Sequence, residues 1–244
     1  MINEEENLIY KNATLEAIYW WNRDEHYYHN YFNDFENIYK NKKLLKFFTT
    51  KIFEIFLRDY SIRRNIEKGY KNVDYFIDEL FEHNFVKRVK KGEIEVVDEV
   101  SNKLKITGNT TNGKEVRSLL SKIAFLINPS EFSLIDSLVK DSLWSIIKDK
   151  KNCKRNELEY YSEFIKQTKI QLQTNSEIIK TQMKLLEKFE NTYAFQFFSK
   201  NPKAFERRIY DKYLWIKKQN KNIDGRKIDN NEYLELESTK YNTV

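Results

Sequence analysis

A carboxylate at the start of an apolar segment is the residue of this chain best suited to do chemistry. The stretch "KIAFLINPSEFSLIDSLV", residues 122–139, passes from an apolar helical pattern through Pro129 and a loop to Asp136, which Ile135 and Ser137 flank. An aspartate at a helix start accepts backbone N–H bonds and is favoured by the helix macrodipole, so it stays ionised at neutral pH. It is either an ordinary cap worth about 1 kcal/mol or a fixed anion that stabilises an oxocarbenium-like sugar cation.

One lysine precedes this aspartate in the same segment. Lys122 lies on the helical pattern before the loop, and it approaches Asp136 if that helix packs against the next one. Asp136 and Lys122 are therefore the candidate catalytic residues, with Lys122 as a supporting charge.

The rest of the chain has few patterns typical of an enzyme. It lacks a Gly-rich phosphate loop and a Gly-x-Ser-x-Gly turn. His26 and His29 have the spacing of half a metal site, but the adjacent tyrosines favour an aromatic surface instead. The single cysteine, Cys153, excludes an intrachain disulfide and fits a reducing cytoplasm. We predict no metal and no cofactor.

Positive charge is concentrated in zones along the chain. The net charge is +6, the first 36 residues are acidic, and bases accumulate over 40–91 and 200–227. Clustered bases are what a polyanion-binding surface needs, although a lysine-rich solvated surface gives the same pattern. The candidate nucleic-acid-binding residues are Arg58, Arg63, Arg64, Lys87, Arg88, Lys114, Arg117, Arg207 and Arg208.

Helices must position these residues. The chain of 244 residues has only 5 Gly and 2 Pro, and apolar residues recur at intervals of three and four along most of it. We predict a mainly α, multi-helix fold of one or two lobes, with at most a small β-hairpin near 86–97. The expected helices cover 13–40, 44–58, 73–85, 114–127, 134–149 and roughly 203–219.

Residues 156–190 have the pattern of one long helix. Apolar residues and three polar ones step by three and four from Leu158 to Phe189, which is a heptad seam. The seam faces either the protein's own core, which we favour, or a second subunit. The domains we predict are a helical domain over 1–150 with the Asp136 site, a long-helix and basic region over 151–227, and a polar tail over 228–244.

Residues 135–139 resemble the helix-hairpin-helix DNA glycosylases, whose essential aspartate lies in an apolar-Asp-[Thr/Ser]-x-[Val/Ile] segment that opens a helix. "SKIAFLINPSEFSLIDSLV", residues 121–139, is similar to small bacterial proteins of the 8-oxoguanine-glycosylase-like group. The resemblance covers residues 113–143 and implies a helical protein that binds duplex DNA, flips a base and cleaves its glycosidic bond, with Asp136 as the catalytic carboxylate.

The chain also departs from that family. The Leu-Pro-Gly-x-Gly hairpin is missing, since Gly113 lies in "TTNGKE", and Ser118 stands where bifunctional members carry a nucleophilic lysine. The resemblance therefore does not extend to a lyase step.

Two functions follow from these patterns. The first is a cytoplasmic DNA-binding protein related to base-excision glycosylases, in bacterial or phage defence or repair. The alternative is a non-catalytic interaction or regulatory protein that forms a homodimer or binds a protein partner through 156–190. No apolar run is long enough to span a membrane, so we predict no membrane partner.

Overall fold

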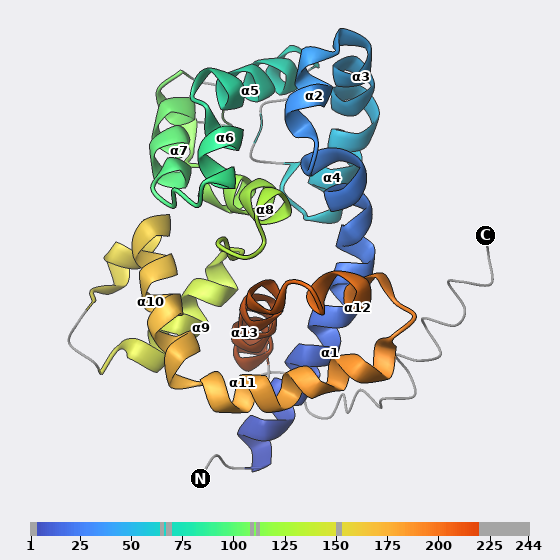
Figure 1. Ribbon diagram of the computed structural model, residues 1–244. Coiled ribbons are helices and arrows are strands. Elements are labelled where there is room, and N and C mark those ends of the chain that lie inside the picture. Colours follow the sequence, from blue (N-terminus) through green and yellow to red (C-terminus); the bar gives the residue numbers. More distant parts are fainter. Residues whose placement is uncertain are drawn as a thin grey trace.

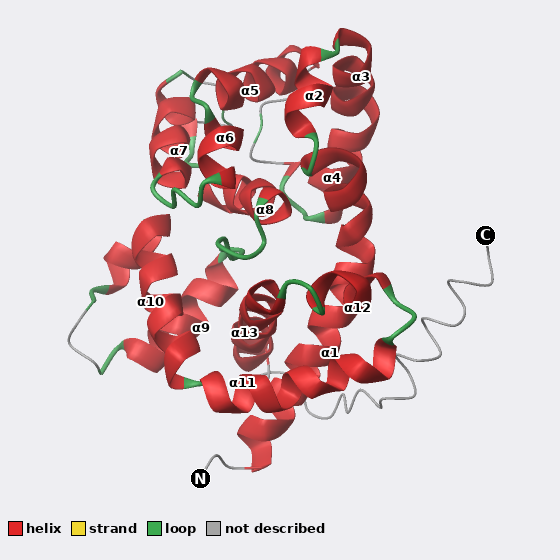
Figure 2. Cartoon of the chain, viewed as in Figure 1, coloured by secondary structure: helices red, strands yellow, loops and turns green. Residues whose placement is uncertain are grey.

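The computed structural model describes residues 4–63, 66, 70–107, 110, 113–149 and 153–219. These residues form helices joined by short loops and turns, and none of them belongs to a strand (Figure 2). No helix in these ranges is both long and apolar enough to cross a bilayer. The mainly α, multi-helix fold that the sequence predicts is confirmed.

The first eight helices are α1 (Glu4–Tyr27), α2 (Phe35–Lys40), α3 (Lys42–Phe47), α4 (Phe53–Asp59), α5 (Tyr70–Glu82), α6 (Phe85–Lys90), α7 (Val96–Ile106) and α8 (Arg117–Ile127). The others are α9 (Ser137–Ile147), α10 (Tyr161–Thr174), α11 (Ser176–Met183), α12 (Tyr193–Phe198) and α13 (Pro202–Gln219). Single π-helical turns over Tyr28–Phe32 and Phe48–Ile52 follow α1 and α3.

The helices gather into two groups, which Figure 1 shows one above the other. Helices α2 to α8 form the upper group, and α9 to α13 form the lower one. Helix α1 begins in the lower group, where it packs along α13, and its π-helical turn reaches α8 in the upper group. Helix α13 also packs against α9, which begins directly after Asp136.

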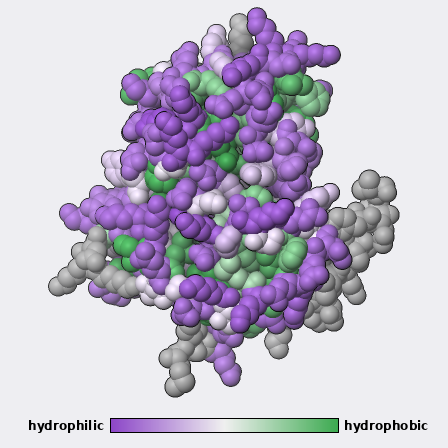
Figure 3. Space-filling model, viewed as in Figure 1, coloured by the Kyte–Doolittle hydropathy of each residue, from purple (hydrophilic) through white to green (hydrophobic). Residues whose placement is uncertain are grey.

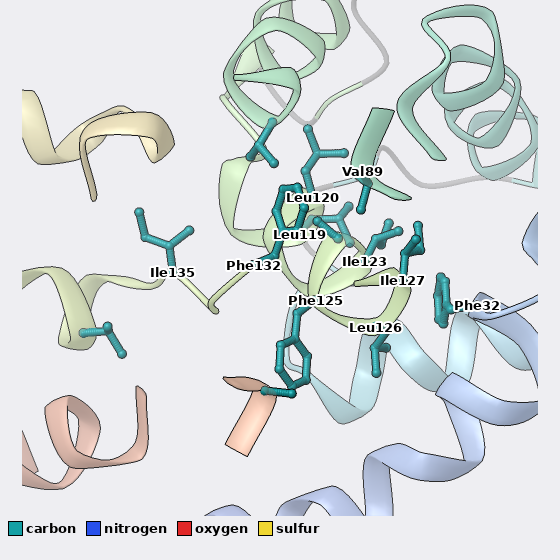
Figure 4. Close-up of a cluster of buried hydrophobic side chains, with 14 of the residues drawn as sticks. Phe32, Val89, Leu119, Leu120, Ile123, Phe125, Leu126, Ile127, Phe132 and Ile135 are labelled. Carbon is teal, nitrogen blue, oxygen red and sulfur yellow. The ribbon is translucent and has the colours of Figure 1, made fainter. Parts of the chain in front are cut away.

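Helix α8 lies in the middle of the hydrophobic core. All of its residues except Ser118 are buried, as expected for a helix that is apolar on nearly every side. Figure 4 shows Ile123 and Leu126 extending from α8 in different directions, while Phe125 points toward the C-terminal helices. Helix α8 is therefore a fixed support for the loop that leads to Asp136.

The predicted β-hairpin near 86–97 is wrong. Residues Phe85–Lys90 and Val96–Ile106 are helices α6 and α7, and the chain turns between them at Gly92, which has φ of +79°. The valines that suggested strand alternation instead form the buried sides of two successive helices.

The prediction of one continuous helix over 156–190 is also wrong. The chain is extended at Tyr160, with φ −80° and ψ +130°, and it bends again at Asn175. Short 3₁₀ segments, Arg155–Glu159 and Lys184–Phe189, stand at the two ends. Most seam residues are nevertheless buried within this single chain, so the prediction that the seam faces the protein's own core is confirmed. The domain boundary at residue 150 stays a prediction, and the predicted tail over 228–244 lies outside the described residues.

Candidate active site: Asp136 and a buried charge cluster

Asp136 is the N-cap of α9. Its backbone is extended, with φ −147° and ψ −180°, and its Oδ1 accepts a hydrogen bond from the Val139 N–H at 2.9 Å. The next residue back, Ile135, donates its N–H to Ser121 Oγ of α8 at 3.2 Å. Asp136 is half-buried and held by both helices, so the position of its carboxylate is set by the backbone rather than by side-chain rotation alone.

Hydrogen bonds from three further helices fix the loop before Asp136. The Tyr161 hydroxyl of α10 donates to the Ser133 carbonyl at 2.7 Å and accepts from the Ser133 N–H at 3.0 Å. Arg207 of α13 donates to the Ser130 carbonyl at 2.6 Å, and Asn128 donates to the Val89 carbonyl of α6 at 3.0 Å. Elements from both helix groups therefore determine where the carboxylate lies.

Lys122 lies on α8, and its closest polar partner is Ser118 rather than Asp136. Its Nζ donates to Ser118 Oγ at 2.9 Å, and the side chain is buried. Burial lowers the pKa of Lys122 to about 8, and the negative charges of Asp136 and Asp211 act in the opposite direction. The charge of the Lys122 side chain therefore changes as the pH passes through about 8.

Lys122 belongs to a buried charge cluster, whose other members are Asp24, Arg208, Asp211 and Lys212. Arg208 of α13 donates from Nη2 to Asp24 at 3.0 Å and from Nη1 to Asp211 at 2.9 Å. Burial raises the pKa of both carboxyl groups, and the Arg208 charge opposes that rise. The cluster links α1, α8 and α13 at the point where α9 begins.

Lys212 is the second amine of the cluster. Burial, and then the positive charge of Arg208, lower the pKa of Lys212 to about 7. Its Nζ lies 4.4 Å from the centre of the Trp20 ring and 3.8 Å from a Glu16 carboxylate oxygen. The aromatic face and the carboxylate favour the ammonium, but less strongly than burial disfavours it.

Three polar atoms of the cluster have no hydrogen-bond partner among the described residues. They are Asp24 Oδ1, Arg208 Nε and Asp211 Oδ1, and all three are buried. Buried polar atoms are almost always paired in folded proteins, so these three are exceptions to the usual pairing. Strongly shifted pKa values and unpaired polar atoms in one place are typical of functional sites.

The sequence did not indicate Asp24, Asp211 or Lys212 as site residues, although a signal for one of them was present. Asp24 follows the buried Trp21 by three positions on α1, so it lies on the apolar face of that helix. A carboxylate on the buried face of a helix costs free energy unless a cation pairs with it. The partner, Arg208, is 184 residues away and is not visible in the local pattern.

The candidate nucleic-acid-binding residues divide into three sets. Arg58, Lys87 and Lys114 are exposed and pair with no carboxylate among the described residues. Arg63 is half-buried and pairs with Glu54, and Arg88 is half-buried and pairs with Glu93 and Glu99. Arg117, Arg207 and Arg208 are buried, and Arg64 lies outside the described residues.

The buried arginines have structural partners. Arg117 donates to Asp98 at 2.5 Å, and Asp98 in turn accepts the Tyr161 and Ser162 N–H groups at the start of α10. Arg207 donates to the loop before Asp136, and Arg208 holds the charge cluster together. Arg207 and Arg208 are both buried, so the charges of these two candidate nucleic-acid-binding residues do not face solvent.

His26 and His29 lie at the end of α1 and in the π-helical turn after it. His26 packs edge-on against Tyr27 and Tyr31, and His29 lies 3.7 Å from Glu25. The ranges that the structure describes contain no group of three or more metal-binding side chains.

Comparisons of the chain with protein-family models, curated proteins and solved structures found no match.

Proposed function

We propose that this protein is a DNA N-glycosylase in which Asp136 stabilises the positive charge that develops on the sugar as its bond to the base breaks. The observation that carries the proposal is the Asp136 carboxylate, which its hydrogen bond to the Val139 N–H fixes at the start of α9. Asp136 and Lys122 both lie in the segment that resembles the glycosylases, and they come from two successive helices joined by a loop.

In this reaction the main contribution of the protein is an anion held in position beside the sugar. The bond from C1′ to the base nitrogen breaks, and both electrons leave with the base. Water adds to C1′ and releases a proton, which neutralises the departing base. A carboxylate fixed before the reaction stabilises the cationic sugar without reorganising, and such groups are typically worth factors of about 10² to 10³ in rate.

Lys122 acts in this proposal as a positioning residue. The negative charges of Asp136 and Asp211 favour its ammonium, which in turn balances two acids that would otherwise repel each other. Because its Nζ is buried and bonded to Ser118, Lys122 does not attack the sugar itself. We therefore infer base removal without strand cleavage by the protein.

Exposed cations supply the affinity for DNA. Arg58, Lys87 and Lys114 are the candidates whose charges face solvent. Contacts between such side chains and phosphates release counterions, so binding weakens as salt rises.

The test uses labelled duplexes that each contain one modified base, namely uracil, 8-oxoguanine, hypoxanthine or 3-methyladenine. After incubation, half of each sample is heated in alkali, which breaks the strand at an abasic site. We expect a break at the modified position of at least one duplex after alkali and none without it. Binding to the duplexes with no alkali-labile site in any of them would contradict the proposal and favour the non-catalytic interaction protein.

A further inference from the structure

The segment Lys42–Asp59 is one uninterrupted helical rod with two very different sides. Helix α3, the π-helical turn Phe48–Ile52 and α4 follow one another, and Phe47, Phe48, Ile52 and Phe53 at their junctions all have right-handed helical backbones. The inner side contributes Phe48, Phe53, Phe56 and Leu57 to the core.

The outer side of this rod exposes large apolar side chains. Leu44, Phe47 and Ile55 are 48%, 52% and 41% exposed, and their spacing places them on one stripe. No residue of α3 is buried. Single exposed apolar residues are ordinary on protein surfaces, but three on one stripe are typical of a surface that binds something.

Positive charge surrounds the stripe. The exposed cations are Lys40, Lys42, Lys43, Lys46, Lys51 and Arg58, and no carboxylate among the described residues lies within ion-pair distance of any of them. The acids of the rod, Glu54 and Asp59, pair with Arg63 and Arg23. Two further acids, Asp74 and Asp78 of α5, line a hollow of about 260 Å³ beside Lys42 and Lys46. The outer side is therefore cationic as well as apolar.

The rod lies at the edge of the molecule. Figure 1 places α3 and α4 at the upper right, at the opposite end from α9 and α10. In Figure 3 the same region shows hydrophobic surface between hydrophilic areas. A flat partner can reach this edge without approaching Asp136.

We propose, in place of the sequence-based prediction of no membrane partner, that the outer side of the α3–α4 rod docks on an anionic phospholipid surface. Leu44, Phe47 and Ile55 enter the boundary between headgroups and acyl chains, where apolar side chains leave water. Lys43 and Lys51 contact headgroup phosphates. Nucleic acid fits this surface less well, because the aliphatic Leu44 and Ile55 neither stack on bases nor bind phosphate.

Vesicle flotation tests the proposal. The probes are vesicles of phosphatidylcholine alone and vesicles of phosphatidylcholine mixed with phosphatidylglycerol. We expect the protein to float with the anionic vesicles only, and to do so less as salt rises. The double variant Leu44→Ser/Phe47→Ser should bind at least about tenfold more weakly, because both side chains that enter the membrane are lost.

Two controls keep the result specific. Ile106→Ser removes an apolar side chain that is 79% exposed on α7, and it should bind vesicles like the wild type. Circular dichroism should show unchanged helix content in all variants, because the altered side chains are exposed. Equal flotation of the double variant and the wild type, or no flotation with anionic vesicles, would overturn the proposal. Binding of single-stranded oligonucleotide that Phe47→Ser abolishes, without vesicle binding, would assign the surface to nucleic acid instead.

Discussion

Lys122 is one of two buried lysines through which pH acts on the candidate site, and Lys212 is the other. Burial lowers the pKa of Lys122 to about 8, so the folded protein loses this proton at a lower pH than the unfolded chain does. Between that value and the ordinary lysine pKa, the unfolded chain binds the extra proton, and the contribution of Lys122 to stability rises with pH. Catalysis has the opposite dependence, because a neutral Lys122 no longer balances the charges of Asp136 and Asp211.

The first prediction is an alkaline decline in activity. Base removal by the wild type should fall as pH rises through about 8, since Lys122 loses its charge there. Lys122→Gln should be less active below that pH and should lack this decline, because glutamine does not titrate. Single-turnover rates between pH 6 and pH 9.5 measure both profiles. A decline of the same shape in Lys122→Gln would show that another group causes it.

The second prediction concerns the contribution of Arg208 to stability. Arg208→Gln leaves the buried carboxylates of Asp24 and Asp211 without their cation, and breaking a buried pair in this way costs about 3–5 kcal/mol. Arg155→Gln is the matched control, because Arg155 is exposed and its pairing with Asp141 contributes about 1 kcal/mol or less. Urea unfolding should separate the two variants clearly. Equal midpoints would mean that the charge cluster does not stabilise the fold.

The loop before Asp136 is the element on which the site's geometry depends. Tyr161 connects it to α10 through two hydrogen bonds to Ser133, and Tyr161→Phe removes both. We expect a loss of stability of about 1–3 kcal/mol for the unpaired Ser133 groups and a fall in base removal larger than any fall in DNA binding. Tyr160→Phe is the control, because that ring is exposed. An unchanged rate in a Tyr161→Phe protein would separate the loop from catalysis.

Periodicity predicted most helices but not their interruptions. Spacing by three and four continues through Asn175 because α10 and α11 both bury the same side of the chain, so the bend between them leaves the pattern intact. The valines of 86–97 fit a strand and two short helices equally well, and burial by α8 decides between them. The Asp136 cap could be predicted, because it depends on neighbouring residues alone. The Arg208 contacts could not, because Asp24 is distant in sequence.

Across the whole molecule, fewer positive side chains are free to bind nucleic acid than the composition indicates. The net charge is +6, yet buried or paired arginines make up five of the nine candidate nucleic-acid-binding residues, Arg63, Arg88, Arg117, Arg207 and Arg208. Affinity for DNA should therefore depend on a few exposed cations rather than on the whole basic zones.

The salt dependence of DNA binding measures directly which cations contact phosphates. Lys87→Gln and Lys114→Gln should each reduce the slope of log affinity against log salt by about 1, as the loss of one phosphate contact does. Arg88→Gln should change the slope little, because its guanidinium already pairs with Glu93 and Glu99. Unchanged slopes in both lysine variants would place the DNA elsewhere on the molecule.

The central claim is that the charge of Asp136 drives the breaking of a glycosidic bond, and Asp136→Asn tests it most directly. Asparagine caps a helix about as well as aspartate, so the variant should keep its fold, its melting temperature and its DNA binding. Asp141→Asn, on the same helix, is the control, and it should retain wild-type activity. On whichever duplex the wild type cleaves, we predict that Asp136→Asn releases the base at least about 10²-fold more slowly in single turnover. Full activity in a folded Asp136→Asn protein would contradict the account.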